Sequence, residues 1–428
     1  MPARNGPPQA SRWLLVPNLG AEEGGDWTRH ASLPAVRHAV HLWRLLFPAA
    51  HRVIENAGDE AADWPGDLGE RPERAAFRWL DERPGVHAWL GDASARDRAQ
   101  AAGAAWTGPD PALTRAVHDK AFALQQAEQL GFVPRPLRGC AFVVEPDGLA
   151  DPAVALAEIE SRLSGWPSWM DGFVLKPRSG SSGRGRVAGS RRSLAGDAIA
   201  RALPRLAERG GAVVEPWLER NVDLSVALDL RPPGDANHSG VTLLGSLESI
   251  VTHAGVPLGH VGEVDSRGRV FSGTRFEEEI REAAAAVAGA ARDAGWFGPC
   301  GVDSFAFRAP DEAGAEREWL RPVVELNARY TLGLVAIGVV RRLLGRLRDE
   351  LGLGPGARRA FLLALRPPPG YGNWSDAASA AGPGALAVAL APSADAGAAG
   401  PGLVVTSDRS ALEPLLEAFR RSPGDAST

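Results

Sequence analysis

The residues from Phe173 to Val187 join a cation to a loop of small residues. An apolar run ends in Lys176, a loop follows with three Gly and three Ser in seven residues, and a strand is expected to begin at Val187. Glycine lets backbone N–H groups approach an anion, serine adds hydroxyl donors, and Lys176 adds a point charge. The pattern predicts a loop that covers a phosphate group. The alternative is a solvated loop between two strands.

Two better-known glycine-rich loops do not fit this segment. In the P-loop a Gly-Lys-Ser/Thr sequence opens a helix, whereas here Lys176 precedes the glycines. The protein-kinase loop has G-x-G-x-x-G spacing, whereas Gly183, Gly185 and Gly189 are spaced G-x-G-x-x-x-G. The segment is therefore neither of these phosphate-binding loops.

A second group of residues capable of chemistry lies on two expected strands later in the chain. Asp303 is on the first, and Glu325, Asn327 and Arg329 follow on the second. Because strand side chains repeat every two residues, the last three point the same way. Carboxylate and amide oxygens suit Mg²⁺ that bridges phosphates, and Arg can neutralise a transferring phosphoryl group. The alternative, a solvent-facing polar strand, fits poorly beside the apolar run 322–324.

Lys120 lies within a helix expected over residues 113–130. The apolar face of this helix carries Leu113, Val117, Leu124 and Ala127. A Lys on the core side of a helix needs an anion or a route to solvent. Lys120 therefore either binds phosphate or extends its stem past the core.

In their order along the chain, these features resemble the ATP-grasp superfamily, in which a strand-borne Lys and a Gly/Ser-rich hairpin loop fold over a triphosphate. The resemblance spans about residues 113–335. It is carried by Asp119-Lys120 with Gly131 and Pro134 downstream, Lys176 with its glycine loop, the segment from Glu215 to Asp223, and Asp303 with Glu325, Asn327 and Arg329.

The resemblance implies an ATP site. In the family a strand that ends in an acid lines the adenine, a backbone carbonyl and the N–H two residues later contact the base edge, and a downstream carboxylate takes the ribose. Asp223 stands where that last acid is expected, and Glu219 competes with it. The alternative is a strand, a turn and a second strand whose acidic side chains face solvent. The implied ATP-binding residues are Lys120, Lys176, Ser179, Gly180, Ser181, Ser182, Gly183, Glu215, Pro216, Trp217, Leu218 and Asp223.

The resemblance also implies Mg²⁺ or Mn²⁺ as cofactor, held by Asp303, Glu325 and Asn327, and catalytic roles for Lys176 and Arg329. In one respect the chain departs from the family. Some members carry an Arg just before the metal-binding Asp, in the place of Gly301 here. An Arg that binds substrate must then come from elsewhere, and the candidates are Arg184, Arg186 and Arg275.

The activity that the resemblance implies is that of a carboxylate-amine ligase. ATP would phosphorylate a carboxylate, and an amine would displace phosphate to form an amide, so that ADP and phosphate are released. A carboxylate is deprotonated at pH 7 and needs no general base. The alternatives are a kinase acting on a hydroxyl, which would need such a base, and a nucleotide-binding protein without turnover. The sequence identifies neither the carboxylate nor the amine.

The composition of the 428-residue chain fits this class. A net charge of -5 and a charged fraction of 23% give no basic excess for nucleic acid. The apolar runs are too short to span a bilayer and no signal pattern opens the chain, so we expect a cytoplasmic protein with small-molecule substrates. Cys140 and Cys300 have no metal-ligand spacing. The oligomeric state is open, and a homodimer is compatible with the sequence.

The elements that must position these residues begin with an alternation typical of a parallel α/β domain. Strands are expected at 13–16, 52–55 and 86–90, and helices at 33–46, at 72–81 and from 94. A Gly-rich loop, 17–25, follows the first strand, where open α/β sheets place ligands, unless it is a plain turn.

The rest of the pattern predicts α+β structure. We expect strands at 137–145, 211–215, 241–251, 256–262, 385–390 and 403–406, and helices at 151–163, 193–208, 276–293 and 334–347, with Ser410 and Glu413 as the capping box of a last helix. The predicted fold class is thus α/β and α+β, an ATP-grasp fold. Its parts are a pre-grasp domain (1–112), a lid with a linking helix (113–214), an antiparallel core with the adenine and metal sites (215–350) and a C-terminal appendage (351–428).

Overall fold

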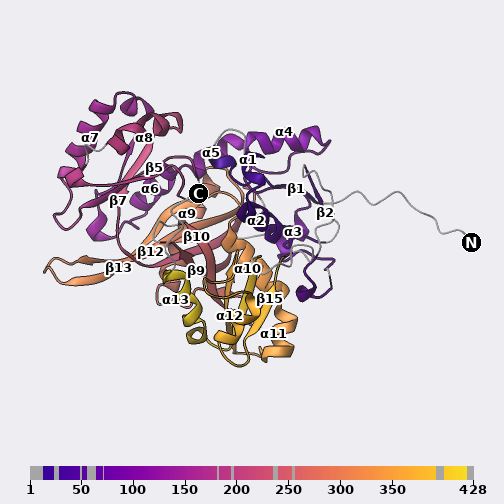
Figure 1. The fold of residues 1–428 in the computed structure, drawn as a ribbon. Coiled ribbons are helices and arrows are strands. Elements are labelled where there is room, and N and C mark those ends of the chain that lie inside the picture. Colours follow the sequence, from indigo (N-terminus) through magenta and orange to yellow (C-terminus); the bar gives the residue numbers. More distant parts are fainter. Residues whose placement is uncertain are drawn as a thin grey trace, which may run out of the picture.

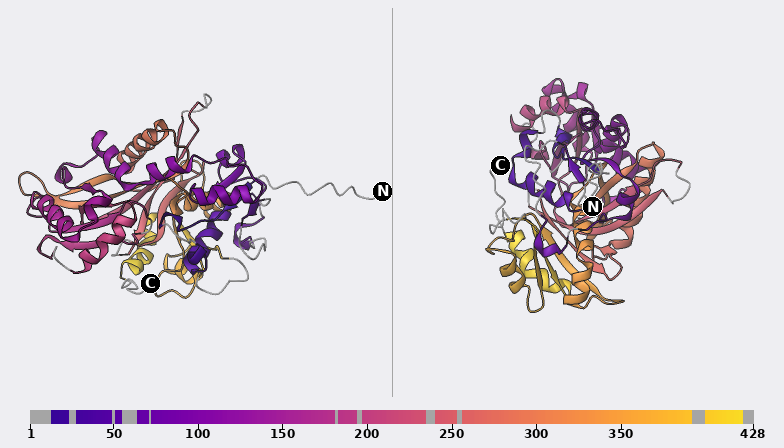
Figure 2. Two further views of the ribbon diagram at one scale, coloured as in Figure 1. Left: turned by 90° about the horizontal axis from the view of Figure 1, so that it is seen from above. Right: turned by 90° about the vertical axis from the view of Figure 1, so that its right-hand side faces the viewer.

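The computed structural model describes residues 13–23, 28–48, 51–54, 64–70, 72–180, 183–193, 197–234, 240–252, 256–391 and 400–421. Within these residues the strands form sheets of three, four and nine strands. The nine-stranded sheet lies in the middle of the molecule, with the four-stranded sheet and its helices at one end and the N-terminal sheet at the other (Figures 1 and 2). Among the helices described, none is long and apolar enough to cross a membrane.

The N-terminal sheet is parallel, as the sequence predicted. It has the order β2 (His51–Val53), β1 (Trp13–Val16), β3 (Gly85–Ala88). Its helices are α1 (Thr28–Ala31), α2 (Pro34–Arg44), α3 (Arg78–Glu82) and α4 (Ala93–Ala101), with 3-10 turns η1 (Ala21–Glu23) and η2 (Gly66–Leu68). The helix expected over 72–81 is confined to α3, because the N–H groups of Ala75 and Ala76 bond to Asp81 Oδ1 and Leu46 O.

The four-stranded sheet is an antiparallel lid that carries the glycine loop. Its order is β4 (Phe142–Val144), β7 (Ala212–Pro216), β5 (Gly172–Pro177), β6 (Val187–Ser190), and the glycine loop joins β5 to β6. The helices α7 (Pro152–Ser164) and α8 (Asp197–Glu208) and the 3-10 turns η3 (Arg135–Leu137), η4 (Pro146–Leu149) and η5 (Arg191–Ser193) complete it. Buried Ile159, Phe173 and Leu203 belong to one apolar cluster, which fixes the sheet to the helices.

The nine-stranded sheet contains the core and the C-terminal residues. Its order is β13 (Glu316–Asn327), β12 (Gly298–Pro310), β8 (Arg220–Leu230), β9 (Val241–Val251), β11 (Val270–Phe271), β10 (Pro257–Asp265), β14 (Arg358–Ala364), β16 (Gly402–Thr406), β15 (Leu386–Ala389). The pairings are antiparallel except β9 with β11. Residues after 350 thus extend the core sheet through β14.

The helices of this region are α9 (Glu277–Asp293), α10 (Leu332–Arg342), α11 (Leu344–Leu351), α12 (Trp374–Ala380) and α13 (Glu413–Arg421), with the 3-10 turn η7 (Arg409–Leu412) before the last. The predicted Ser410 and Glu413 capping box is wrong. Asp408 accepts from Ala411 N, and Ser410 Oγ donates to Asp408. An Asp two residues earlier therefore takes the capping role, and it caps η7.

The single helix expected over 113–130 is two helices, α5 (Pro111–His118) and α6 (Lys120–Gln129). The chain breaks at Asp119, whose extended backbone (φ -64°, ψ 129°) and side-chain bond to Ala121 N make it the N-cap of α6. Lys120 is therefore the first residue of α6 and does not lie inside a continuous apolar stripe. Its backbone N–H donates to Arg178 O, which ties α6 to the lid.

Helix α10 is buried between the core sheet and the N-terminal domain. Its residues from Gly333 to Val340 are all buried. Gly338 faces Leu46 and Phe77 so closely that a Cβ there would overlap both side chains. Its missing side chain thus allows α10 and the N-terminal domain to pack together.

We therefore expect Gly338→Ala to lower stability by about 1 to 3 kcal/mol through overpacking, although Ala favours helix by about 1 kcal/mol. The matched control is Gly289→Ala in α9, where a Cβ meets no atom within 4 Å. That control should raise stability. Thermal unfolding of both variants checks the pair, and equal shifts of the same sign would contradict the packing argument.

Candidate functional site

The predicted site residues from the lid and from the core converge where the two sheets meet. Lys176 and Glu215 come from β5 and β7 of the lid, Asp303 and Glu325 from β12 and β13 of the core, and Lys120 from the start of α6. Ion pairs link Lys176 to Glu215 and Lys120 to Glu325. Segments that lie more than 200 residues apart in the sequence, such as those of Lys120 and Glu325, thus form one charged cluster.

Glu215 is held by two cations. Lys176 Nζ pairs with Oε1, and Arg321 Nη2 donates to Oε2 at 2.7 Å. The Glu215 side chain is only 5% exposed. Burial raises the pKa of Glu215, but Arg321 and Lys176 outweigh it and lower that pKa to about 2. Glu215 is therefore ionised, and both of its oxygens are engaged within the chain.

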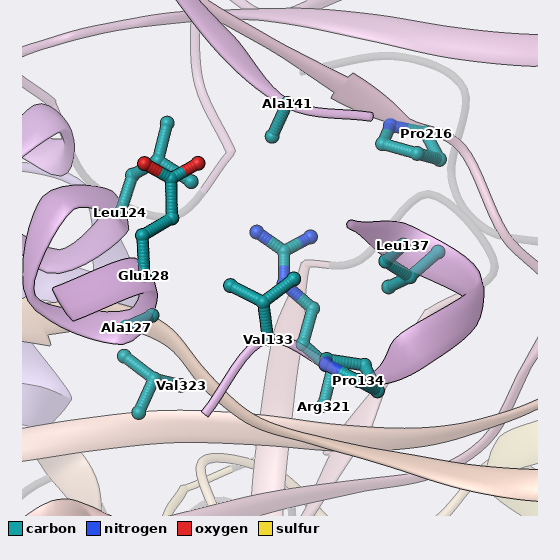
Figure 3. Close-up of a pocket in the computed structure, with 10 residues that line it drawn as sticks. All are labelled: Leu124, Ala127, Glu128, Val133, Pro134, Leu137, Ala141, Pro216, Arg321 and Val323. Carbon is teal, nitrogen blue, oxygen red and sulfur yellow. The ribbon is translucent and has the colours of Figure 1, made fainter. Parts of the chain in front are cut away.

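Sequence reasoning missed Arg321. It lies on β13, and the pairing of β13 with β12 shifts register between Arg321 and Glu325, so the two-residue period that grouped Glu325 with Asn327 does not extend to it. Figure 3 shows its guanidinium in a small pocket between α6 and the lid. The lining is mostly apolar: Leu124, Ala127, Glu128, Val133, Pro134, Leu137, Ala141, Pro216, Arg321 and Val323. The pocket adjoins the segment predicted for adenine through Pro216.

Lys120 connects the glycine loop to the core acids. Its Nζ lies 3.3 Å from Glu325 Oε2 and donates to Gly180 O at 2.8 Å. Burial raises the pKa of Glu325, but Lys120, Lys176, His118 and Arg329 together lower it to about 2. Of the two explanations for Lys120, a place among phosphate-binding groups fits this position better than an extension to solvent, because its side chain is 13% exposed.

Asp303 and Glu325 face each other across β12 and β13, where they are paired in register. Burial first, and then the charge of Glu325, raise the pKa of Asp303 to about 7. Two carboxylates that face each other repel when both are ionised, and a cation between them stabilises the ionised form of both. Two hard carboxylates suit Mg²⁺, which takes several further oxygens from water and phosphates. The described residues hold no group of three or more His, Cys, Asp or Glu side chains that would bind a metal without such help.

Asn327 presents its nitrogen, not its oxygen, to this pair. Its Nδ2 donates to Asp303 Oδ2 at 2.9 Å, and its Oδ1 accepts from Arg329 Nη2 at 3.1 Å. The carboxylates therefore fit Mg²⁺ as they stand, and Asn327 fits only after its amide turns over. Arg329 lies beside it, and its Nε is 2.7 Å from Glu22 Oε1 of the N-terminal domain.

The segment predicted for adenine joins β7 to β8. Pro216 ends β7, and the Trp217 N–H donates to Gly172 O, so the segment is fixed to the lid sheet. Asp223 lies on β8 and pairs with Arg220 at 2.7 Å, and burial raises the pKa of Asp223. Of the two acids considered for the ribose hydroxyls, Asp223 is half-buried and Glu219 is exposed, so the surroundings of Asp223 suit that role better.

The glycine loop is held at two points by one arginine, Arg209. Arg209, which sequence reasoning also missed, donates to Ser179 O at 2.8 Å and to Arg184 O at 3.4 Å. Gly180 and Gly183 have positive φ angles of 149° and 69°, which glycine tolerates best. Ser181 and Ser182 lie outside the described residues.

The three candidate substrate arginines differ in their surroundings. Arg184 pairs with Glu23 at 2.7 Å, and Arg186 lies 5.3 Å from the centre of the Trp217 ring. Arg275 is exposed and pairs with Glu318 on β13, which also accepts from Asn221 Nδ2 on β8. The structure therefore brings Arg184 and Arg186 to the loop region, but not Arg275.

The Lys176, Glu215 and Arg321 group generates a pH prediction. Because the pKa of folded Glu215 is about 2 and its ordinary value is 4.5, the stability it contributes is present above pH 4.5 and is lost as the pH falls toward 2. We expect Glu215→Gln to lose about 3 kcal/mol at pH 7 relative to wild type, and less at pH 3. Urea unfolding at both pH values checks this, and an equal loss at both would contradict it.

Comparison with protein-family models found no match, and comparison with curated proteins found none either. Solved structures do match. The chain resembles carboxyaminoimidazole ribonucleotide synthase from Aspergillus clavatus, complexed with ATP, at 16% identity and a TM-score of 0.50, covering 96% of this chain and 98% of that one. The same enzyme with ADP and 5-aminoimidazole ribonucleotide matches at 16% identity, 96% and 99% coverage and a TM-score of 0.49.

Biotin carboxylase from Campylobacter jejuni matches at 15% identity, 94% and 89% coverage and a TM-score of 0.44. At these identities the likeness concerns the fold, and the first match carries it. The three sheets and their helices match that synthase over nearly the whole of both chains. The predicted fold class is therefore confirmed, and this chain has the ATP-grasp fold.

Proposed function

We propose that this chain is an ATP- and Mg²⁺-dependent ligase that activates a carboxylate as an acyl phosphate, which an amine then attacks. One observation carries the proposal. The whole chain contains two lysines among its 47 Lys and Arg residues, and these are Lys120 and Lys176. Wherever else the chain needs a cation it uses Arg, so both lysines stand where a compact ammonium matters. Both lie in the charged cluster and pair with Glu325 and Glu215.

The two lysines are proposed to bind the phosphates of ATP. Each is engaged by a carboxylate in the ligand-free chain, and an incoming triphosphate offers the same charge. The remaining proposed ATP contacts are the glycine-loop residues 179–183 and the segment 215–218 with Asp223. The solved structure that carries the fold comparison is complexed with ATP, which supports this part of the proposal.

Asp303 and Glu325, with Asn327 after rotation of its amide, are the proposed residues that hold the metal. Bound Mg²⁺ would neutralise charge on the phosphate oxygens. Arg329 is proposed to neutralise the transferring phosphoryl group or the carboxylate that receives it. We also propose the four functional parts 1–112, 113–214, 215–350 and 351–428, with the catalytic groups on the second and third.

A carboxylate acceptor suits this cluster better than a hydroxyl. A hydroxyl acceptor needs a general base. Asp303, whose pKa is near 7, is proposed to hold the metal, and the other buried base beside the cluster, the His118 imidazole, is a weak one. Burial, with Arg329 nearby, lowers its pKa to about 4. The amine that completes the reaction attacks as a free base and displaces phosphate, so the chain must mainly position the reactants.

The reaction is tested with ATP, Mg²⁺ and hydroxylamine as a trap, using bicarbonate, acetate and the standard amino acids as carboxylates. A ligase releases ADP and phosphate and yields a hydroxamate with its carboxylate, and Glu325→Gln should abolish this yield. Phosphate appearing on a stable hydroxyl product would favour the kinase alternative. ATP binding without ADP release under any of these conditions would favour the scaffold alternative.

We expect Lys176→Met to weaken ATP binding about tenfold or more, because a charge-assisted contact is worth about 1.5 to 3 kcal/mol. The matched control is Arg192→Met, which removes an exposed cation of the same lid. Calorimetric titration with ATP checks both variants. Equal ATP affinity in wild type and Lys176→Met would refute the phosphate role of Lys176.

A further inference from the structure

Arg329 is held by the first loop of the N-terminal domain. Its Nε lies 2.7 Å from Glu22 Oε1, and Glu22 belongs to η1, directly after the loop that follows β1. Both side chains are buried, with Arg329 12% and Glu22 1% exposed. The loops at the carboxyl ends of parallel strands are where open α/β sheets place ligands. The N-terminal domain therefore reaches the charged cluster through one buried ion pair.

Glu22 is itself fixed in place. Its second oxygen, Oε2, accepts from the Gly20 N–H at 3.1 Å. The same loop is tied to the loop after β3, because Asn18 Nδ2 donates to Leu90 O at 2.9 Å and Asn18 Oδ1 accepts from Leu90 N at 3.1 Å. Leu90 in turn forms an antiparallel bridge with Arg329. Backbone and side-chain contacts thus hold Glu22 and Arg329 in one rigid arrangement.

The guanidinium of Arg329 keeps donors for a ligand. Nη2 donates to Asn327 Oδ1 at 3.1 Å, and Nη1 donates to Tyr330 O at 2.9 Å. Each Nη atom carries two N–H groups, so one on each has no partner in the described part of the chain. Asn327, which accepts from Nη2, also donates to Asp303, so one amide group joins the guanidinium to the two facing carboxylates. A substrate oxygen could accept from them without displacing Glu22.

We propose that Glu22 is a positioning residue that orients Arg329 for the reaction, an inference that rests on the proposed ligase function. Glu22 neutralises the Arg329 charge, so it cannot improve the attraction of an anionic substrate. Its contribution must be geometric, because the buried ion pair at Nε, together with the bonds of Nη1 and Nη2, holds the guanidinium in one position. Glu22 lies in the Gly-rich segment 17–25, and a plain turn there would not need an acidic residue.

This role has a kinetic signature. Glu22→Gln removes a negative charge from beside Arg329 and also releases the guanidinium. We expect kcat for carboxylate-dependent ADP release to fall roughly 10- to 100-fold, as misplacement of a catalytic group does. KM for the carboxylate should stay equal or decrease. Glu22→Asp, which keeps the charge on a shorter stem, should recover part of kcat. The exposed acid Glu160 on α7 supplies the control, Glu160→Gln, with kinetics equal to wild type.

A spectroscopic measurement separates this inference from the ligase proposal. The Arg329 Nε–H should give a slowly exchanging nitrogen-15 resonance, identified by its absence in Arg329→Lys. It should be lost in Glu22→Gln and retained in Glu22→Asp and Glu160→Gln, at temperatures where all variants remain folded. If wild type releases no ADP with any carboxylate, the ligase proposal fails while this measurement still decides whether Glu22 fixes Arg329. An unchanged resonance in Glu22→Gln would overturn the inference, as would a kcat of Glu22→Gln equal to that of wild type.

Discussion

The facing carboxylates of Asp303 and Glu325 are the constraint on which the rest of the site depends. Burial of Asp303 first, and then repulsion by the charge of Glu325 on the neighbouring strand, raise the pKa of Asp303 to about 7. The positive charges of Lys120 and Arg329 lower the free-energy cost of placing two carboxylates side by side. The elements that carry these two residues must therefore lie close to the sheet. The break of the helix at Asp119 meets that need, because it places Lys120 at the start of α6.

The same electrostatic requirement explains why separate parts of the chain meet at one place. The lid contributes Lys176 and Glu215, α6 contributes Lys120, and the N-terminal loop contributes Glu22, each paired with a group of opposite charge. Removing one partner of a buried pair leaves an uncompensated charge, which costs several kcal/mol. The sheets are thus connected by ion pairs at the site and by apolar packing, such as that of α10, away from it.

The sequence predicted the secondary structure through local patterns, whereas the ATP-grasp fold and members of the cluster such as Glu215 came from the family resemblance. Alternating strands and helices indicate a parallel N-terminal sheet, and the two-residue period of β13 places Glu325 and Asn327 on one face. Which partner each charge takes depends on residues far apart in sequence. Arg321, Arg209 and Glu22 were missed for that reason, since no local pattern shows that an Arg on β13 meets an acid on β7. The sequence held one further signal: the chain has two lysines, Lys120 and Lys176, and such a rare residue type is more informative about a site than a common one.

The acidic residues of the cluster already balance its lysines, as the anionic groups of substrates would. Lys176 and Lys120 are neutralised by Glu215 and Glu325, so a triphosphate would exchange one anion for another instead of filling a bare cationic site. On the proposed function, such an exchange would release Glu325 Oε2 from Lys120. Asp303 and Glu325, which already face each other, would then both be available to hold a divalent cation together with phosphate oxygens. Arg329 would keep its place during this exchange, because it pairs with Glu22 of the N-terminal domain and not with Glu215 or Glu325.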